Sequence, residues 1–214
     1  MITVYGRASS SNVQAVLWGL EEMGLEYERL DYGFTFGGLD TDAFRAMNPH
    51  GKIPVLKDGD TVVWESAAVL RYLATAYGSA PFWPEDAGAR ARIDMWAEWA
   101  KNSVAAGFTG PVFWLAVRFK PESRDPALIA ENVKRLEVEL AKADAVLAGQ
   151  DYLAGPEFTL ADIALGHVLY RYFDIEIVRS DLPRLQAYYD RLAERPAYRS
   201  IVMTSYDMLR NSFG

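Results

Sequence analysis

The feature that most constrains the fold is an ordered set of four short signals in the first third of the chain. Helix-capping residues at 10–12 come first, and a Gly-Lys-Ile-Pro-Val segment follows at 51–55. An Asp-Gly pair at 58–59 and a Trp-Glu-Ser-Ala segment at 64–67 complete the set. Asp-Gly between two apolar runs is a strong hairpin signal. The order predicts a βαβ unit, a bend, a hairpin and a further helix start.

The patterns around these signals predict a small α/β domain over residues 1–77. Helical spacing of apolar residues follows the first caps and ends near Gly24, and Ser66 is expected to cap a helix that ends near Tyr77. Strands are expected over 2–5, 26–30, 53–56 and 61–64, and a short helix over 40–47. The order βαβ-α-ββα implies a four-stranded mixed sheet with helices on both faces.

The rest of the chain predicts an all-helical domain over 88–214, after a proline-containing linker at 78–87. Helices are expected over 88–118, 127–147, 160–173 and 183–195, and Pro196 suits the first turn of a last short helix. The predicted fold class is therefore α/β plus all-α, with one domain of each kind.

Composition limits the chemistry. The chain has 22 basic and 29 acidic residues, and its net charge of −7 disfavours non-specific binding to nucleic acid. It has no cysteine, which excludes disulfides, thiolate metal sites and a cysteine nucleophile. His50 and His167 are too few and too far apart to predict a metal site. No apolar run is long enough to span a membrane, and we expect a cytoplasmic protein.

Three segments resemble the cytosolic glutathione transferases, in particular serine-type bacterial members. They are Asn-Pro-His-Gly-Lys-Ile-Pro-Val-Leu at 48–56, Trp-Glu-Ser-Ala-Ala-Val-Leu-Arg-Tyr-Leu at 64–73 and Phe-Thr-Leu-Ala-Asp-Ile-Ala at 158–164. The resemblance covers essentially the whole chain. It implies a thioredoxin-like N-terminal domain, a helical C-terminal domain and a homodimer. It also implies a cis bond before Pro54, and a capping box formed by Thr159 and Asp162.

The activity implied by this resemblance is the addition of the glutathione thiolate to small electrophiles, including by halide displacement. A glutathione-dependent disulfide or peroxide reductase is one alternative, because the Ser-Ser-Asn run at 10–12 resembles the Thr-Pro-Asn run of disulfide-reducing bacterial members. A non-catalytic glutathione-binding module is the other alternative. The co-substrate implied in each case is glutathione, with no metal.

The resemblance also assigns residues to glutathione. A helix N-terminus favours a carboxylate, so Ser66 is expected to meet the γ-glutamyl carboxylate, with Glu65 beside it for the ammonium group. Lys52 is expected near the glycyl carboxylate. The alternatives are that Glu65 and Ser66 only cap a helix and that Lys52 is a solvated surface residue. The residues expected to bind glutathione are His50, Lys52, Ile53, Pro54, Glu65 and Ser66.

The candidates for activating the sulfur are Ser10, Ser11 and Asn12. Lowering a thiol pKa from about 8.5 to about 6.5 needs roughly 2.7 kcal/mol. One hydrogen bond to a charged acceptor supplies about 1.5–3 kcal/mol, so a serine at a helix start suffices. In the serine-type members that the chain resembles, the activating serine lies about six residues before the apolar valine of this helix. Counted back from Val16, the resemblance implies Ser10, with Ser11 and Asn12 as close rivals and Ser9 as a weaker one. Tyr5 lies inside a strand, where packing is the expected role.

The electrophile pocket is expected between the two domains. Its predicted lining is Phe34, Phe36, Trp114 and Arg118, with Trp96, Trp99, Phe113 and Phe119 as further candidates from the long helices. Arg118 stands among apolar residues, so it is expected to pair with an acidic substrate, with a glutathione carboxylate, or with a structural salt-bridge partner. The same alternatives apply to Arg7.

Overall fold

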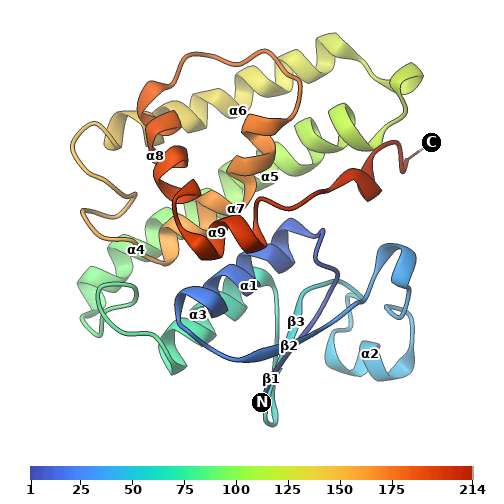
Figure 1. Cartoon of the computed structure of the whole chain (residues 1–214), viewed down its shortest axis with the longest axis vertical. Coiled ribbons are helices and arrows are strands. Elements are labelled where there is room, and N and C mark those ends of the chain that lie inside the picture. The colour runs from blue at the N-terminus through green and yellow to red at the C-terminus, as the bar shows by residue number, and fades with distance from the viewer. Residues whose placement is uncertain (214) are drawn as a thin grey trace.

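The N-terminal part of the chain is built on one four-stranded sheet (Figure 1). A computed structural model describes residues 1–213. The strands are β1 (Ile2–Tyr5), β2 (Tyr27–Leu30), β3 (Val55–Asp58) and β4 (Thr61–Trp64), in the order β2-β1-β3-β4. β1 pairs parallel to β2, whereas the other two pairings are antiparallel. The predicted mixed sheet is therefore confirmed.

Helices α1 (Ser11–Glu22) and α3 (Ser66–Ala76) pack against each other and cover one face of this sheet. Strand side chains alternate between faces, so Ile2 and Val4 of β1 are buried under these helices. Gly24 has a φ of +65° and ends α1, as predicted.

The short helix α2 (Asp42–Met47) is fixed by a different contact, an aromatic stack. Thr41 caps it by accepting a hydrogen bond from Phe44 N at 3.3 Å. The buried Phe44 ring stacks on Tyr32, and Tyr32 meets the Tyr5 ring edge-on at 5.3 Å. Tyr5 thus has the packing role expected of it.

The second part of the chain is helical, as predicted (Figure 1). α4 (Ala87–Trp99) continues through π-helical turns (Ala100–Ala105 and Thr109–Arg118) on either side of α5 (Ala106–Phe108). The remaining helices are α6 (Pro126–Val146), α7 (Leu160–Asp174), α8 (Pro183–Ala193) and α9 (Pro196–Ile201). In residues 1–213, no helix combines the length and the apolar character that crossing a membrane requires.

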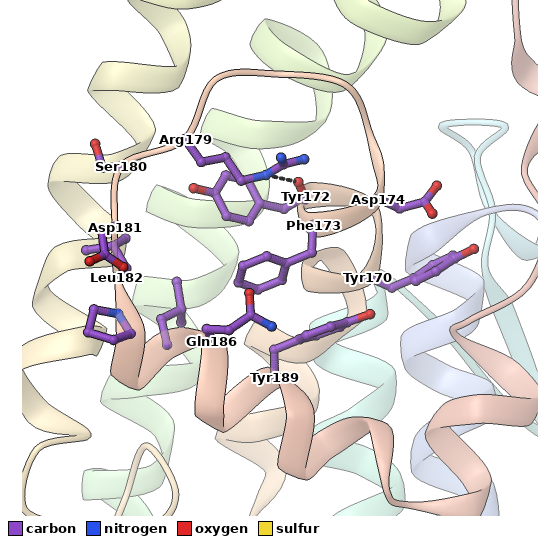
Figure 2. Close-up of a pocket in the computed structure, with 12 residues that line it drawn as sticks. Tyr170, Tyr172, Phe173, Asp174, Arg179, Ser180, Asp181, Leu182, Gln186 and Tyr189 are labelled. Atoms are coloured by element: carbon purple, nitrogen blue, oxygen red, sulfur yellow. Dashed lines mark hydrogen bonds between the residues drawn. The ribbon is translucent and has the colours of Figure 1, made fainter.

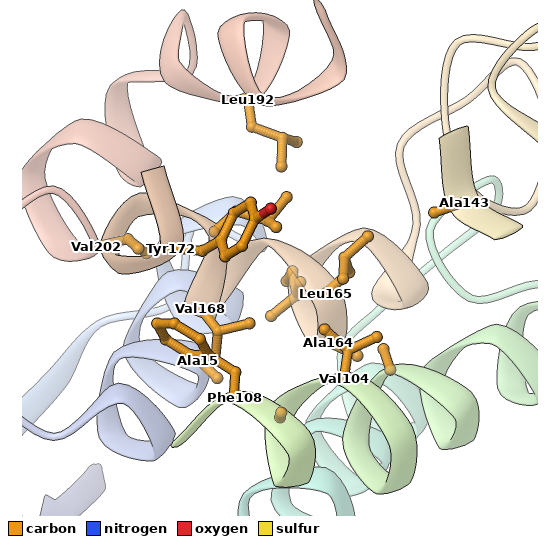
Figure 3. Close-up of a cluster of buried hydrophobic side chains, with 14 of the residues drawn as sticks. Ala15, Val104, Phe108, Ala143, Ala164, Leu165, Val168, Tyr172, Leu192 and Val202 are labelled. Atoms are coloured by element: carbon orange, nitrogen blue, oxygen red, sulfur yellow. The ribbon is translucent and has the colours of Figure 1, made fainter. Parts of the chain in front are cut away.

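Helix α7 is the centre of the molecule. Figure 3 shows Ala164, Leu165 and Val168 of α7 in one apolar cluster with Ala15 of α1 and Phe108 of α5. α7 packs on both α1 and α4, so it fixes the helical part onto the sheet part. The predicted capping box starts this helix, with Thr159 N–H donating to Asp162 Oδ2 at 2.8 Å.

Several predicted element boundaries differ from the structure by a residue or two. Ser66 is the first residue of α3 rather than its cap, because the backbone enters the helix at Glu65. β3 starts at Val55 rather than Ile53, since Pro54 has no backbone N–H to donate to a neighbouring strand. Asp58 still pairs with Thr61, so the hairpin turn is at 59–60.

Candidate functional site

The start of α1 presents a serine hydroxyl that the helix does not use. Ser10 occupies the N-cap position, with φ −89° and ψ 121°, and its side chain makes no capping hydrogen bond. Ser10 is partly exposed, whereas Ser9 and Ser11 are buried. Of the three serines in this turn, Ser10 is the one that is both accessible and free of a capping role.

The start of α3 lies against the start of α1. Ser66 Oγ donates a hydrogen bond to Asn12 Oδ1 at 3.2 Å, although the two residues are 54 positions apart in the sequence. Ser66 is only 5% exposed, so this contact is a fixed part of the site. The structure therefore brings together two groups of residues that the sequence singled out separately.

A lysine from the helical part completes this contact. Lys101 Nζ donates to Ser66 Oγ at 3.3 Å and lies 3.8 Å from Glu65 Oε2. Sequence reasoning did not single out Lys101. The available signal was a lone lysine between Trp99 and Phe108 in an otherwise uncharged stretch.

Glu65 has an unusual backbone. Its φ of +69° lies in the left-handed region, which non-glycine residues seldom adopt. The conformation leaves its side chain half exposed next to the start of α3. A strained residue at a polar, accessible helix start is a reason to consider a functional role.

The side chain of one buried asparagine bonds to the backbone of the loop before β3 and fixes its conformation. Asn48 is 2% exposed, and its side chain donates to Lys52 O at 2.8 Å and accepts from His50 N at 3.0 Å. The predicted cis bond between Ile53 and Pro54 is present at the end of this loop. Lys52 and His50 are exposed.

Glycine lets this loop approach the start of α1. A Cβ at Gly6 would lie 2.5 Å from Val13 Cγ2 and 3.2 Å from Ile53 Cβ, so a larger residue could not be accommodated without a shift. Ile53 and the start of α1 are therefore direct neighbours. The six residues expected to bind glutathione belong to this loop and to the start of α3, and Ile53 and Ser66 connect both segments to the region around the start of α1.

The electrophile candidates meet only in part. The guanidinium carbon of Arg118 lies 5.5 Å from the centre of the Phe34 ring and 5.6 Å from that of Trp114. Arg7 also lies 5.5 Å from the Phe34 ring. These four side chains form one cluster of aromatic and cationic groups. Phe36, which follows Phe34 by two residues in the sequence, is half exposed.

The other aromatic candidates pack elsewhere. Phe113 is 1% exposed and belongs to the helical core, where its ring meets Phe108. Trp96 packs edge-on against Trp99, whose indole N–H donates to Glu139 at 2.8 Å. Phe119 meets Phe213, which also lies 3.6 Å from the Arg118 guanidinium carbon. Phe213 was missed because an isolated aromatic near a chain end carries no pattern.

Burial changes the charge properties around the site. Desolvation lowers the pKa of Arg7 and, together with the nearby charge of Arg7, lowers that of Arg118. Burial and the neighbouring Lys101 lower the pKa of His167 to about 4. His167 is therefore neutral at pH 7, and the positive charge near the site comes from lysine and arginine.

A separate hollow lies in the helical part (Figure 2). It has a volume of about 650 Å³ between the end of α7 and the start of α8, and Arg179 Nε donates to Tyr172 O at 2.8 Å in its wall. It contains none of the predicted site residues. No group of three or more side chains suited to a metal ion occurs among residues 1–213.

Comparisons with known proteins identify the family. The family model described as "Glutathione S-transferase, N-terminal domain" matches residues 1–75, and "Glutathione S-transferase, C-terminal domain" matches residues 109–196. The chain belongs to the glutathione S-transferase family. The two matches cover the α/β part and most of the helical part.

Relatives of this transferase match along nearly its whole length. It is 40% identical to Glutathione S-transferase GstB of Escherichia coli, over 95% of this chain and 98% of that protein. It is 34% identical to Glutathione S-transferase 3 of Zea mays, over 94% of this chain and 93% of that protein. The chain is an enzyme of this class, and the family resemblance seen in the sequence is confirmed.

Solved structures agree with this assignment. A theta class glutathione S-transferase from Xanthomonas axonopodis pv. citri, with glutathione bound, superposes with a TM-score of 0.90 at 46% identity. The match covers 95% of the transferase and 98% of that chain. The predicted fold, a thioredoxin-like domain followed by a helical domain, is confirmed.

Proposed function

We propose that this transferase binds glutathione along the edge formed by α1, α3 and the loop before β3, converts its thiol to the thiolate, and adds it to small electrophiles. The observation that carries the proposal is the contact between Asn12 and Ser66, with Lys101 joining it from the helical part. It brings two helix N-termini to one point beside the unused Ser10 hydroxyl. The glutathione bound to the Xanthomonas relative supports this choice of ligand.

The γ-glutamyl end of glutathione is assigned to the start of α3. Backbone N–H groups and the helix dipole there attract its carboxylate, and the Ser66 hydroxyl adds a further donor. Lys101 adds a positive charge 3.3 Å from that hydroxyl. Glu65 is assigned to the ammonium group, for which its half-exposed carboxylate is accessible.

The rest of the peptide is assigned to the loop before β3. Ile53 lies beside Gly6, close to the start of α1, and its backbone N–H and C=O can pair with an extended peptide as a neighbouring strand would. Pro54, the next residue, is buried. Lys52 and His50 are exposed at the end of this loop and are assigned to the glycyl carboxylate.

The thiol-activating residue is assigned to Ser10. Ser11 is 8% exposed, and the Asn12 side chain is already engaged with Ser66. A hydrogen bond from the Ser10 hydroxyl to the sulfur favours the thiolate, and the thiol proton passes to solvent. The N-terminus of α1 stabilises the same negative charge.

The electrophile is assigned to the space beside Phe34, Phe36, Trp114 and Arg118. The thiolate forms a bond to the electrophilic carbon, and where that carbon carries a halide, the halide leaves with the bonding electron pair. The cationic and aromatic cluster around Arg118 is the supporting observation. Domain limits at residues 77 and 88, a homodimer and a cytoplasmic location stay predictions.

A paired assay tests the reaction type. We expect turnover of a chloronitroaromatic substrate with glutathione and little reduction of hydroxyethyl disulfide. Turnover of the disulfide alone would favour a reductase on this scaffold. Retention on a glutathione column without either activity would favour a binding module, and absence of glutathione binding would contradict the proposal.

A further inference from the structure

Three buried polar atoms lie close to the start of α1 without a hydrogen-bond partner. They are Arg7 Nε, Ser9 Oγ and Arg171 Nε. Within residues 1–213, no other buried side-chain nitrogen or oxygen lacks a hydrogen-bond partner. Arg171 is 4% exposed and Ser9 is 5% exposed. Buried polar groups in folded proteins nearly always have partners, so three together call for an explanation.

The three atoms belong to one region. Arg171 Nη2 donates to Ser9 O at 2.8 Å and to Gln14 Oε1 at 3.1 Å, which ties the end of α7 to the start of α1. In the sequence, Arg7 lies two residues after the end of β1 and two residues before Ser9. Burial lowers the pKa of both Arg171 and Arg118, and the nearby charge of Arg7 lowers each further.

Arg7, Arg118 and Arg171 differ from the partly buried arginines that form ion pairs. Arg71 pairs with Asp94, and Arg195 pairs with Glu22. Among residues 1–213, no carboxylate lies within 4 Å of the guanidinium groups of Arg7, Arg118 or Arg171, which are named here as the arginine cluster. Isolated buried cations are costly unless an anion accompanies them.

Aromatic rings provide only part of the compensation. Phe34 lies 5.5 Å from both Arg7 and Arg118, and Phe213 lies 3.6 Å from Arg118. Arg118 Nε also donates to Ser212 Oγ at 3.0 Å, but Arg7 Nε and Arg171 Nε have no acceptor, and cation–π contacts do not supply one. The cluster thus joins aromatic surface to cationic donors, a combination suited to a small ligand with an apolar body and an anionic group.

We infer that the arginine cluster binds a carboxylate carried by the electrophile, so that the transferase prefers anionic electrophiles. This inference rests on the proposed function, because it places the electrophile next to the sulfur at Ser10. The reaction is unchanged by it. The thiolate sulfur bonds to the carbon that carries the halide, the carbon–halogen bond breaks, and the halide leaves with the electron pair.

The alternative acceptor is a carboxylate of glutathione itself. Both of those carboxylates have other positions in the proposed complex, at the start of α3 and at the loop that carries Lys52. Arg118 and Arg171 belong to the helical part, and Arg118 contacts Phe34 and Trp114, the residues assigned to the electrophile. An anionic group on the electrophile is the ligand that fits this position.

Matched substrate pairs test the inference. One pair is 4-chloro-3,5-dinitrobenzoate and the corresponding benzamide, and a smaller pair is iodoacetate and iodoacetamide. The protein contains no cysteine, so these reagents do not alkylate a protein thiol. We expect kcat/KM, divided by the uncatalysed rate constant, to be at least tenfold higher for the carboxylate in at least one pair, equivalent to about 1.4 kcal/mol.

Arginine variants locate the preference. Arg118→Gln should bring the carboxylate-to-amide ratio close to one, and Arg118→Lys should retain part of it. Arg210→Gln is the matched control, because it removes the same charge from an exposed arginine that pairs with Asp207. It should keep the ratio. Arg7→Gln serves as the second variant if thermal unfolding shows that Arg118→Gln does not fold.

The outcomes separate this inference from the proposed function. A wild-type ratio near one in both pairs would overturn the inference alone, as would an equal loss of the ratio in Arg210→Gln. If Arg118→Gln instead raises the KM for glutathione and keeps the ratio, Arg118 binds a glutathione carboxylate and the inference is wrong. Calorimetry showing no glutathione binding would overturn the proposed function first.

Discussion

The two ends of helix α7 show buried polar groups in opposite conditions. At its start, Asp162 is fully buried, and its carboxylate accepts hydrogen bonds from Leu153 N, Thr159 N, Thr159 Oγ1 and Tyr188 OH. Near its end, Arg171 is almost as buried, yet its Nε has no acceptor and no carboxylate is paired with it. The buried carboxylate at the start of α7 thus finds its partners within the protein, whereas the buried guanidinium near the end lacks an acceptor.

This difference distinguishes buried polar groups that stabilise the fold from buried polar groups that are suited to binding a ligand. A buried group whose partners all come from the chain contributes to stability and needs nothing further. A buried cation that lacks an anion lowers the stability of the free protein and gains most when an anion arrives. We therefore expect changes at Asp162 to affect folding, and changes at the arginine cluster and at the other residues assigned to ligands, such as Ser10 and Glu65, to affect binding and catalysis with little effect on folding.

The largest expected effect is on stability at Asp162. Asp162→Ala removes the acceptor of several buried donors, each costing about 1–3 kcal/mol when unsatisfied, so the free energy of unfolding should fall by about 3–5 kcal/mol. Denaturant unfolding followed by circular dichroism measures this loss. Asp207→Ala, at an exposed ion pair, is the control and should change little. A small loss at Asp162 would remove the basis of the comparison.

The next effect is on glutathione affinity at Glu65. Glu65→Ala leaves the ligand's ammonium group without its acceptor, and a charged hydrogen bond contributes about 1.5–3 kcal/mol. Glutathione should bind about ten- to a hundredfold more weakly, with stability nearly unchanged. Calorimetry gives the affinity, and Glu28→Ala, at an exposed position on β2, is the control. Unchanged affinity in a folded Glu65→Ala protein would rule out this assignment.

A comparable effect is expected on the bound thiol at Ser10. Ser10→Ala should raise the pKa of bound glutathione by about one to two units, each equal to about 1.4 kcal/mol. The thiolate fraction at neutral pH should fall tenfold or more, while glutathione affinity changes little. Ultraviolet absorbance of the thiolate across pH measures the pKa. If Ser11→Ala or Asn12→Ala alone raises it, the choice of Ser10 is wrong.

The smallest effect concerns the pH dependence of stability. Burial raises the pKa of Asp162 to about 6 in the folded protein, above an unfolded value near 3.8. Folding therefore takes up a proton at pH values between these two pKa values, and the contribution of Asp162 to stability declines as pH rises through 6. The stability advantage of the wild type over Asp162→Asn should shrink by about 1.4 kcal/mol from pH 5 to pH 7. A constant difference between the two proteins would show that the pKa of Asp162 is not raised.

Much of the fold could be predicted because its signals are local. Apolar periodicity, the Asp-Gly turn and Gly24 place elements to within a residue or two. The one-residue error at Ser66 arose because serine is a common cap, whereas the chain uses Glu65 with a positive φ there. Nothing in the sequence pattern indicates a left-handed glutamate, since non-glycine residues seldom adopt this conformation.

Candidate site residues could be proposed from the sequence only where a motif marks them. The candidates in the loop before β3 and at the start of α3 were singled out from short segments. Lys101 and Arg171 were missed, because each lies far along the chain and reaches the site only through helix packing. A single charge in an apolar helical stretch was the available signal, and it does not say which distant element the charge will meet.

A crystal structure with glutathione bound tests the central claim most directly. The account predicts the sulfur within hydrogen-bond distance of Ser10 Oγ, the γ-glutamyl carboxylate at the start of α3 beside Ser66, and the peptide backbone paired with Ile53. Glutathione bound away from the starts of α1 and α3 would contradict it.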